Sequence, residues 1–156
     1  MRLHRSVPGI IALAIAAPAQ AGTASGAIAV SLTVEPTCHV TARPMPFVWR
    51  AGFPSHAQSD VRIRCSSDTQ VTVAIDDGRN ATGGSRMMRD GQGRLVPYAI
   101  YADAAQTRAW RSDALAVDGA VSAGRALDLV AYGEVGGGPA IEPGEYRDTL
   151  TVTVTF

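Results

Sequence analysis

Two cysteines are the residues of this sequence best suited to form a defined covalent bond. Cys38 and Cys65 are the only cysteines in the chain, and two thiols fall short of the four ligands that a structural zinc site usually takes. In an oxidising compartment the default for such a pair is a disulfide, with two unlinked, buried thiols as the alternative. We therefore predict a structural disulfide bond between Cys38 and Cys65.

A hydrolase triad is the catalytic arrangement that the residue types come closest to. Ser55, His56 and Asp60 lie close together in the sequence, but a triad is defined by geometry rather than by proximity along the chain. No Gly-x-Ser-x-Gly or His-Glu-x-x-His motif accompanies either His56 or His39. We interpret "FPSHAQSD" as a polar loop that contains His56, and we predict neither catalytic residues nor an enzyme.

The sequence gives as little support for a metal, phosphate or sugar site as it does for a catalytic triad. The stretch "DDGRN", residues 76–80, lacks the alternating acidic spacing and the closing glutamate of a calcium loop, so we interpret it as a hairpin turn. The glycines at 91–93 and 136–138 do not stand between a strand and a helix, as a phosphate-binding loop requires. We expect three aromatic residues that could stack on sugars to pack in the core or at its rim instead: Trp49, Tyr101 and Trp110. The sequence thus predicts no metal and no cofactor.

The elements that carry these residues read as strands separated by turns rich in glycine and proline. Apolar and polar residues alternate with a period of two in "TCHVTA", "SDVRIRC", "TQVTVAID" and "YRDTLTVTVTF". Longer strands are expected in "LVPYAIYAD", where Pro97 implies an edge or an irregular start, and in "ALDLVAYGEV". Short strands at regular spacing predict an all-β sandwich. One face of the C-terminal pattern carries Tyr146, Leu150, Val152, Val154 and Phe156.

The N-terminal residues predict export. A basic start with Arg2 and Arg5 precedes an apolar run too short to cross a bilayer, and small residues follow at 19–21. This order is typical of a signal peptide, residues 1–21, that is cleaved after Ala21. Residues 22–156 then suit one domain, and their near-neutral charge without a basic stripe argues against nucleic acid as a partner.

The stretch "GAIAVSLTVEPTC" carries a strand pattern of its own. Four apolar residues alternate with small or polar ones, so one face is apolar and a half-buried strand is predicted. This strand could pair inside its own domain, as an ordinary first strand, or with another molecule. The four residues of its apolar face are Ile28, Val30, Leu32 and Val34.

An ordered set of motifs resembles the spore coat protein U domain, the fold of Csu-type (archaic) chaperone–usher pilins. The set comprises "PTCHV", "VRIRCSSDTQVTVAIDDGRN", "RMMRDGQGRLVPYAIYADAAQTRAW", "AYGEV" and the ending "EPGEYRDTLTVTVTF". One departure lies in "PFVWR", where Val48 occupies the place of a glycine that usually follows a phenylalanine in the family. The conformation of the loop after Ala42 therefore does not follow from the resemblance.

The resemblance implies an immunoglobulin-like β-sandwich that lacks its final strand and so has a hydrophobic groove beside the C-terminal strand. It implies that a periplasmic chaperone fills this groove first and that, at an outer-membrane usher, the N-terminal strand of the next subunit replaces the chaperone. Residues 22–36 are then the donor-strand segment, and residues 37–156 the pilin domain. The predicted donor residues are Ile28, Val30, Leu32 and Val34, and the predicted groove residues are Leu150, Val152, Val154 and Phe156.

The function predicted on this basis is that of a structural pilus subunit, assembled head to tail with other subunits on the cell surface and supporting attachment and biofilm formation. The alternatives are a spore-coat or secreted matrix protein of the same fold, a carbohydrate-binding tip adhesin and a small secreted enzyme. In the family, tip proteins carry an additional receptor-binding domain and lack a donor strand. We expect a single domain with a donor strand here.

Overall fold

The computed structural model describes residues 22–112, 115–137 and 140–156, so the predicted signal peptide lies outside the described residues. The chain divides into two units, Met1–Thr33 and Val34–Phe156. Every strand that the structure describes lies in the second unit. Within the described ranges, the structure contains no apolar helix of the length that a bilayer crossing requires.

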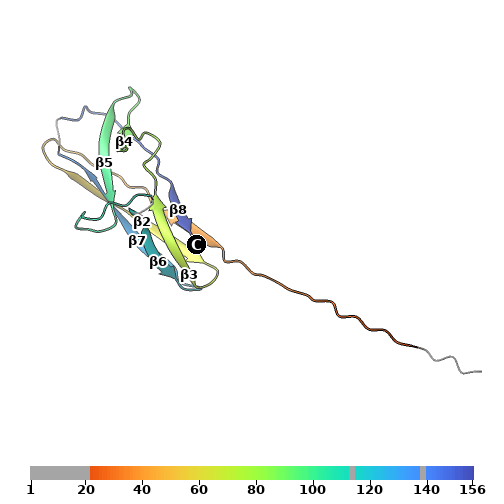
Figure 1. Ribbon diagram of the computed structural model, residues 1–156. Coiled ribbons are helices and arrows are strands. Elements are labelled where there is room, and N and C mark those ends of the chain that lie inside the picture. The colour runs from red at the N-terminus through yellow and green to blue at the C-terminus, as the bar shows by residue number, and fades with distance from the viewer. Residues whose placement is uncertain (1–21, 113–114, 138–139) are drawn as a thin grey trace, which may run out of the picture. The chain divides into compact units, whose positions relative to one another are not determined.

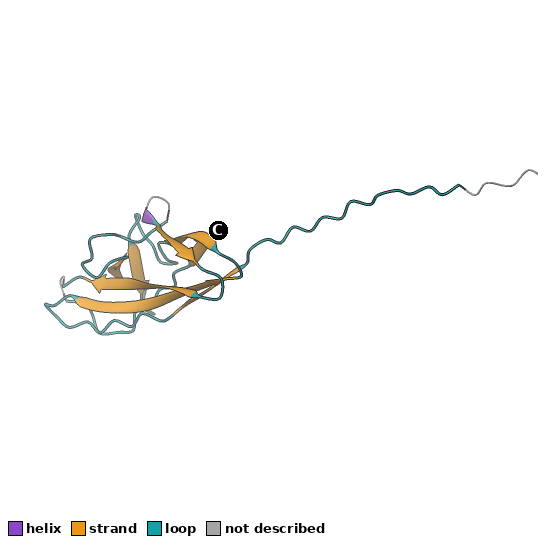
Figure 2. Cartoon of the chain, turned by 90° about the horizontal axis from the view of Figure 1, so that it is seen from below, coloured by secondary structure: helices purple, strands orange, loops and turns teal. Residues whose placement is uncertain are grey.

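The strands of the second unit form two antiparallel sheets (Figure 1). One sheet has five strands in the order β1-β2-β7-β5-β4, and the other has three in the order β6-β3-β8. Strands and connecting loops make up nearly all of this unit (Figure 2), and the prediction of an all-β, immunoglobulin-like sandwich is confirmed. The strands are β1 (Cys38–Ala42), β2 (Ser55–Cys65), β3 (Thr69–Ile75), β4 (Arg86–Arg89), β5 (Leu95–Tyr101), β6 (Val117–Val121), β7 (Ala126–Val135) and β8 (Val152–Thr155).

Apolar side chains from both sheets form one core. Alternate residues of β2 and β3 are buried, among them Ile63 and Val73, because successive side chains of a strand point to opposite faces. Trp110, in the connection from β5 to β6, is also buried, and its indole N–H donates to the carbonyl of Val73 at 2.8 Å. Trp110 therefore packs in the core, as predicted.

β2 begins at Ser55, so the prediction of a loop over "FPSHAQSD" is wrong. Ser55 and Ser59 take inward positions because the preceding loop satisfies their hydroxyls. Ser55 Oγ donates to the carbonyl of Val48 at 2.9 Å, and Ser59 Oγ donates to that of Arg43 at 2.6 Å. His56 is exposed on the opposite face of the strand from Ser55, so these residues do not form the catalytic pair that a triad needs.

One further prediction is corrected by the connections between strands. The "DDGRN" stretch is not a hairpin turn, because β3 and β4 belong to different sheets and the loop between them crosses from one sheet to the other. β4 and β6 themselves did not follow from the sequence pattern. Pro97 pairs with Met87 of β4, whereas pairing with β7 begins at Ala99. β5 is an interior strand of its sheet, but Pro97 has a strand partner on one side only, which agrees with the irregular start that was the alternative to an edge strand.

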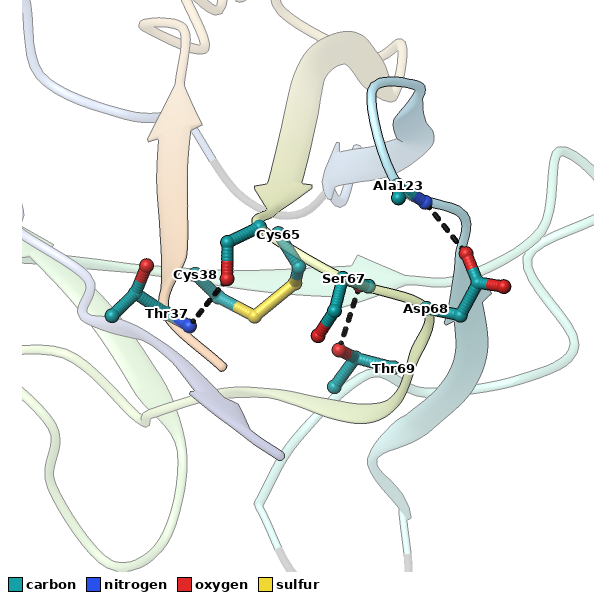
Figure 3. Close-up of a disulfide and its surroundings, with 8 residues drawn as sticks. Thr37, Cys38, Cys65, Ser67, Asp68, Thr69 and Ala123 are labelled. Atoms are coloured by element: carbon teal, nitrogen blue, oxygen red, sulfur yellow. Dashed lines mark hydrogen bonds between the residues drawn. A yellow bond between two sulfur atoms is a disulfide. The ribbon is translucent and has the colours of Figure 1, made fainter. Parts of the chain in front are cut away.

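A disulfide bond joins Cys38 to Cys65, as predicted (Figure 3). Cys38 is the first residue of β1, Cys65 is the last residue of β2, and the two lie directly opposite each other in the register. Beyond the bond, the backbone N–H of Thr37 donates to Ser66 Oγ at 3.0 Å, and that of Ser66 donates to the carbonyl of Thr37 at 2.9 Å. The bond therefore fastens the edge strand β1 to the longest strand of the sheet.

We expect loss of this bond to lower the stability of the folded subunit. Cys38 and Cys65 are 27 residues apart in the sequence, and closing a loop of this length stabilises a fold by about 3.6 kcal/mol in the chain-entropy model. Loss of the disulfide should therefore lower the melting temperature by roughly 10–20 °C. Cys65→Ser, and the double variant Cys38→Ser/Cys65→Ser that leaves no free thiol, should both show this fall in thermal denaturation and a lower periplasmic yield. An unchanged melting temperature and yield would contradict a stabilising role.

Candidate functional site

β8 is an edge strand with one paired side. It pairs with β3, Val154 lying opposite Val73 and Val152 opposite Ile75. In the part of the chain that the structure describes, no strand pairs with the other edge of β8. β8 lies beside β1, an edge strand of the five-stranded sheet (Figure 1).

The residues that lead into β8 also form main-chain hydrogen bonds on the side that β8 directs to β3. Together with β8 they are called the edge segment, residues 147–156. The contacts run from the N–H of Asp76 to the carbonyl of Thr151 (3.0 Å), from the N–H of Arg79 to the carbonyl of Thr149 (3.2 Å), and in both directions between Arg89 and Arg147 (2.9 Å). Odd-numbered residues thus direct their backbone groups to the paired side. Because these directions alternate along an antiparallel strand, Leu150, Val152 and Val154 direct theirs to the open edge.

The side chains of this segment follow the alternation predicted from the sequence, with one exception. Leu150, Val152 and Val154 are half-buried and pack against the core, while the threonines between them are exposed. Phe156 lies beyond β8 and remains 54% exposed. Three of the four predicted groove residues therefore contact the core, and the role of all four in binding a partner stays a prediction.

A cleft of about 710 Å³ opens beside this edge and reaches the core. Leu150 and Val152 line it from the edge segment, and the core residues Val61, Ile100 and Ala131 also line it. The rest of the lining includes the loop after β1, residues 43–47, the side chains of Met88 and Tyr98, and residues 145–149, which precede Leu150 and include Asp148. An apolar cleft next to unpaired backbone groups is the arrangement that an added β-strand can fill.

The loop after β1 packs on the sheet in a way that the sequence did not reveal. Met45 and Phe47 lie against Gly133 of β7 so closely that a Cβ atom at this position would overlap both side chains. The ring of Phe47 packs against that of Tyr98, with 6.4 Å between the centroids. Val48, which stands where the family has a glycine, is 74% exposed. The departure from the family pattern therefore lies outside the core.

Asp148 connects the edge segment to β5 of the five-stranded sheet and to the loop between β3 and β4. Its Oδ2 accepts a hydrogen bond from the hydroxyl of Tyr98 at 2.6 Å, and its Oδ1 accepts from the backbone and side-chain nitrogens of Asn80 at 3.2 and 3.0 Å. Burial, together with this bond to Asp148, raises the pKa of Tyr98, so the phenol stays protonated and donates. Sequence reasoning missed Asp148, although "YRDTL" places it on the apolar face between Tyr146 and Leu150.

Asp76 holds the same segment from the other side. Its Oδ1 accepts from the N–H of Gly78 at 3.0 Å and from the N–H of Thr151 at 2.9 Å. Burial disfavours the charged carboxylate, but the hydrogen bonds from Thr151 and Gly78 prevail and lower the pKa of Asp76. "DDGRN" therefore serves to position the edge segment, and Gly78 (φ +86°) passes so close to Asp148 that no side chain fits there.

Arg86 is a buried cation beneath this loop. Its guanidinium donates to the carbonyls of Ile75 (2.9 Å), Asp76 (2.9 Å) and Trp110 (2.7 Å). These bonds satisfy a charge that would otherwise be costly to bury. In the described ranges, no group of three or more His, Cys, Asp or Glu side chains is placed to hold a metal ion.

The predicted donor segment precedes β1. The structure assigns no strand to residues 22–37 of the single chain. Its apolar side chains are exposed: Ile28 by 90%, Val30 by 89%, Leu32 by 86% and Val34 by 80%. The half-buried strand expected from the alternation is thus absent here, and pairing of this segment with another molecule stays a prediction.

Comparison with known families gives a match over most of the chain. The spore coat protein U domain matches residues 24–153. No curated protein matches the chain significantly.

The solved structures that match this chain include two chains from different complexes. One is a chain in the crystal structure of the CsuC–CsuE chaperone–tip adhesion subunit pre-assembly complex from the archaic chaperone–usher Csu pili of Acinetobacter baumannii, with 26% identity and a TM-score of 0.61. The match covers 80% of this chain but only 40% of that one. A chain from a chaperone–tip adhesin complex of CFA/I fimbriae is 10% identical over 74% of this chain and 41% of that one, with a TM-score of 0.38, too low to carry an argument.

Substitution of Gly78 should destabilise the edge segment. Gly78→Ala imposes a left-handed backbone on alanine and pushes Cβ into the Asp148 carboxylate, at a cost of roughly 2–4 kcal/mol in unfolding free energy. Gly52→Ala is the matched control, since Gly52 has a similar φ of +83° but open space around it, and should cost roughly 1–2 kcal/mol. Chemical denaturation measures both. Equal losses would show that the close approach to Asp148 contributes nothing.

Acid should weaken the hold of Asp76 on Thr151. Because the pKa of Asp76 is lowered in the folded state, its contribution to stability is fully present above the unfolded value of about 3.9 and is lost as pH falls through the lower folded value. Asp76→Asn keeps the shape without the titration. The difference in unfolding free energy between the parent and this variant should therefore be larger at pH 7 than at pH 3, and a difference that does not change with pH would contradict the assignment.

Proposed function

The chain belongs to the spore coat protein U domain family, and from this membership we propose that it is a structural pilus subunit that polymerises by donor-strand exchange. The family consists of structural subunits rather than enzymes. The single observation that carries the proposal is the unpaired edge of β8 above an apolar cleft that reaches the core. An exposed strand edge beside apolar side chains is an aggregation hazard that natural proteins normally cover.

The proposed occupant of the cleft is the N-terminal segment of a second subunit. Residues 22–36 carry the alternating apolar face of a strand and leave it exposed in the single chain. In β-augmentation an extended segment adds to a sheet edge, main-chain hydrogen bonds provide affinity, and alternate side chains provide specificity. The open backbone groups at Leu150, Val152 and Val154 supply the first requirement, and the cleft supplies the second.

Burial of the donor face would drive the joining of subunits. At about 1.5–3 kcal/mol for each fully buried aliphatic side chain, the four donor residues contribute roughly 6–12 kcal/mol. Each main-chain hydrogen bond adds about 0.5–1.5 kcal/mol. Association itself costs about 4–15 kcal/mol, so a lasting joint needs the apolar face and the backbone ladder together.

The subunit would meet several partners on its way to the cell surface. A periplasmic chaperone would cover the cleft before polymerisation, an outer-membrane usher would catalyse the exchange, and other subunits would follow head to tail. The similarity to a chaperone–subunit pre-assembly complex of an archaic chaperone–usher pilus supports a chaperone partner. The fibre would pass through the periplasm to the cell surface and support attachment and biofilm formation there.

A charge on the donor face should stop polymerisation. Leu32→Asp would bury an unpaired carboxylate in the apolar cleft, whereas Ser31→Asp, one residue away on the opposite face, would leave the charge in water. In cells that make the chaperone and usher, unboiled extracts of the Ser31 variant should show a heat-sensitive ladder of multimers on gels. The Leu32 variant should show at least about tenfold less multimer, with its chaperone complex retained.

Deletion of residues 22–35 is the second test of the same proposal. The deletion leaves β1 and the disulfide in place, so the truncated subunit should still bind the chaperone but form no fibre. Normal fibres from the truncated chain, or from the Leu32 variant, would refute donor-strand exchange by this segment.

A further inference from the structure

We propose that the donor segment adds to β8 in one antiparallel register, which is set by Asp148 on the acceptor and Pro36 on the donor. This inference rests on the proposed function and specifies the joint that it requires. In this register, called the matched register below, four apolar residues of one copy lie opposite four apolar residues of the next. The opposed pairs are Val34 with Leu150, Leu32 with Val152, Val30 with Val154 and Ile28 with Phe156.

The direction follows from the sheet that the donor would join. Every strand pairing in the described structure is antiparallel, including that of β8 with β3. Antiparallel ladders are also slightly more stable per residue than parallel ones. An antiparallel donor would extend the three-stranded sheet without changing its pattern.

The alternation of side chains excludes half of the antiparallel registers. Leu150, Val152 and Val154 face the core, and a residue directly opposite one of them faces the same side. A slip of the donor by a single residue would turn the apolar face outward and place Ser31 and Thr33 against the core. Only slips by an even number of residues remain.

Asp148 opposes a slip in one direction. If the donor moved by two residues so that Leu32 lay opposite Leu150, then Val34 would lie opposite Asp148. The Asp148 carboxylate lines the cleft and is held there by Tyr98 and Asn80. An apolar side chain against this group would exclude water from it and offer no hydrogen bond in return.

Pro36 opposes a slip in the other direction. Leu150 directs its backbone groups to the open edge, so the residue opposite it must donate an N–H to complete the ladder. A slip that placed Val34 opposite Val152 would bring Pro36 opposite Leu150. Proline has no N–H to donate, so this bond would be lost. In the matched register Pro36 lies past Leu150, where the chain can leave the edge toward Cys38.

Paired cysteines on the outward faces test the register. In the matched register Ser31 lies opposite Thr153 and Thr33 opposite Thr151, at the closely spaced positions whose side chains a disulfide can bridge. Ser31→Cys/Thr153→Cys and Thr33→Cys/Thr151→Cys are therefore introduced into the full chain in cells that make the chaperone and usher. The slipped pairs Ser31→Cys/Thr151→Cys and Ser31→Cys/Thr155→Cys serve as controls, and Thr33→Cys/Thr155→Cys reports a parallel donor.

The two matched pairs should give ladders that survive boiling in SDS and collapse on reduction, with about tenfold more cross-linked multimer than the slipped or parallel pairs. Equal or stronger linking by a slipped or parallel pair would overturn the register while leaving donor-strand exchange intact. A cross-link confined to monomers, or no heat-sensitive ladder from the unsubstituted chain, would overturn the proposed function and this inference with it.

A donor variant tests the part assigned to Pro36 without altering the acceptor body. Pro36→Ala restores the missing N–H, so it should raise linking by Ser31→Cys/Thr155→Cys severalfold above the level with proline. No increase would show that Pro36 does not restrict the register.

Discussion

β8 offers backbone hydrogen-bonding groups along two edges, and among the residues that the structure describes only one of these edges meets another strand. The open edge borders a cleft that leads to core residues such as Val61 and Ala131. Buried main-chain groups require partners, so an edge in this position stays stable only in water or against another strand. This requirement links two features of the described residues: the exposed apolar face of residues 28–34 and the apolar side chains that line the cleft.

The edge segment keeps its extended form without a second neighbouring strand because polar side chains hold it. Asp76 binds the N–H of Thr151, and Asp148 binds Tyr98 in the opposite sheet and Asn80 in the crossing loop. The buried guanidinium of Arg86 donates hydrogen bonds to three backbone carbonyls, two of which belong to Ile75 and Asp76 next to this segment. The open edge is therefore already held extended, and a strand that added to it would not have to order it. Pre-arrangement reduces the entropy lost on binding.

Most of the fold could be predicted from the sequence. Strict alternation of apolar and polar residues, as in β3 and the second half of β2, identifies both the strand and its buried face. The disulfide could also be predicted, because the chain has only two cysteines. β4 was not predicted because its buried residue is an arginine, Arg86, so its sequence shows no apolar alternation. β6 was not predicted because its central residue, Gly119, has no side chain and packs against Leu127. The roles of Asp76 and Asp148 arise from contacts between residues distant in the chain, and alternation along a single strand carries no information about them.

The position of the disulfide has a mechanical consequence. Tension on the segment that precedes β1 reaches the folded body at Cys38, the first residue of an edge strand. Without a covalent link, such a load would peel β1 away from β2 one hydrogen bond at a time. The bond to Cys65 instead carries the force straight into β2, which is flanked by strands on both sides. A pulled chain would therefore have to shear a doubly paired strand before the body could give way.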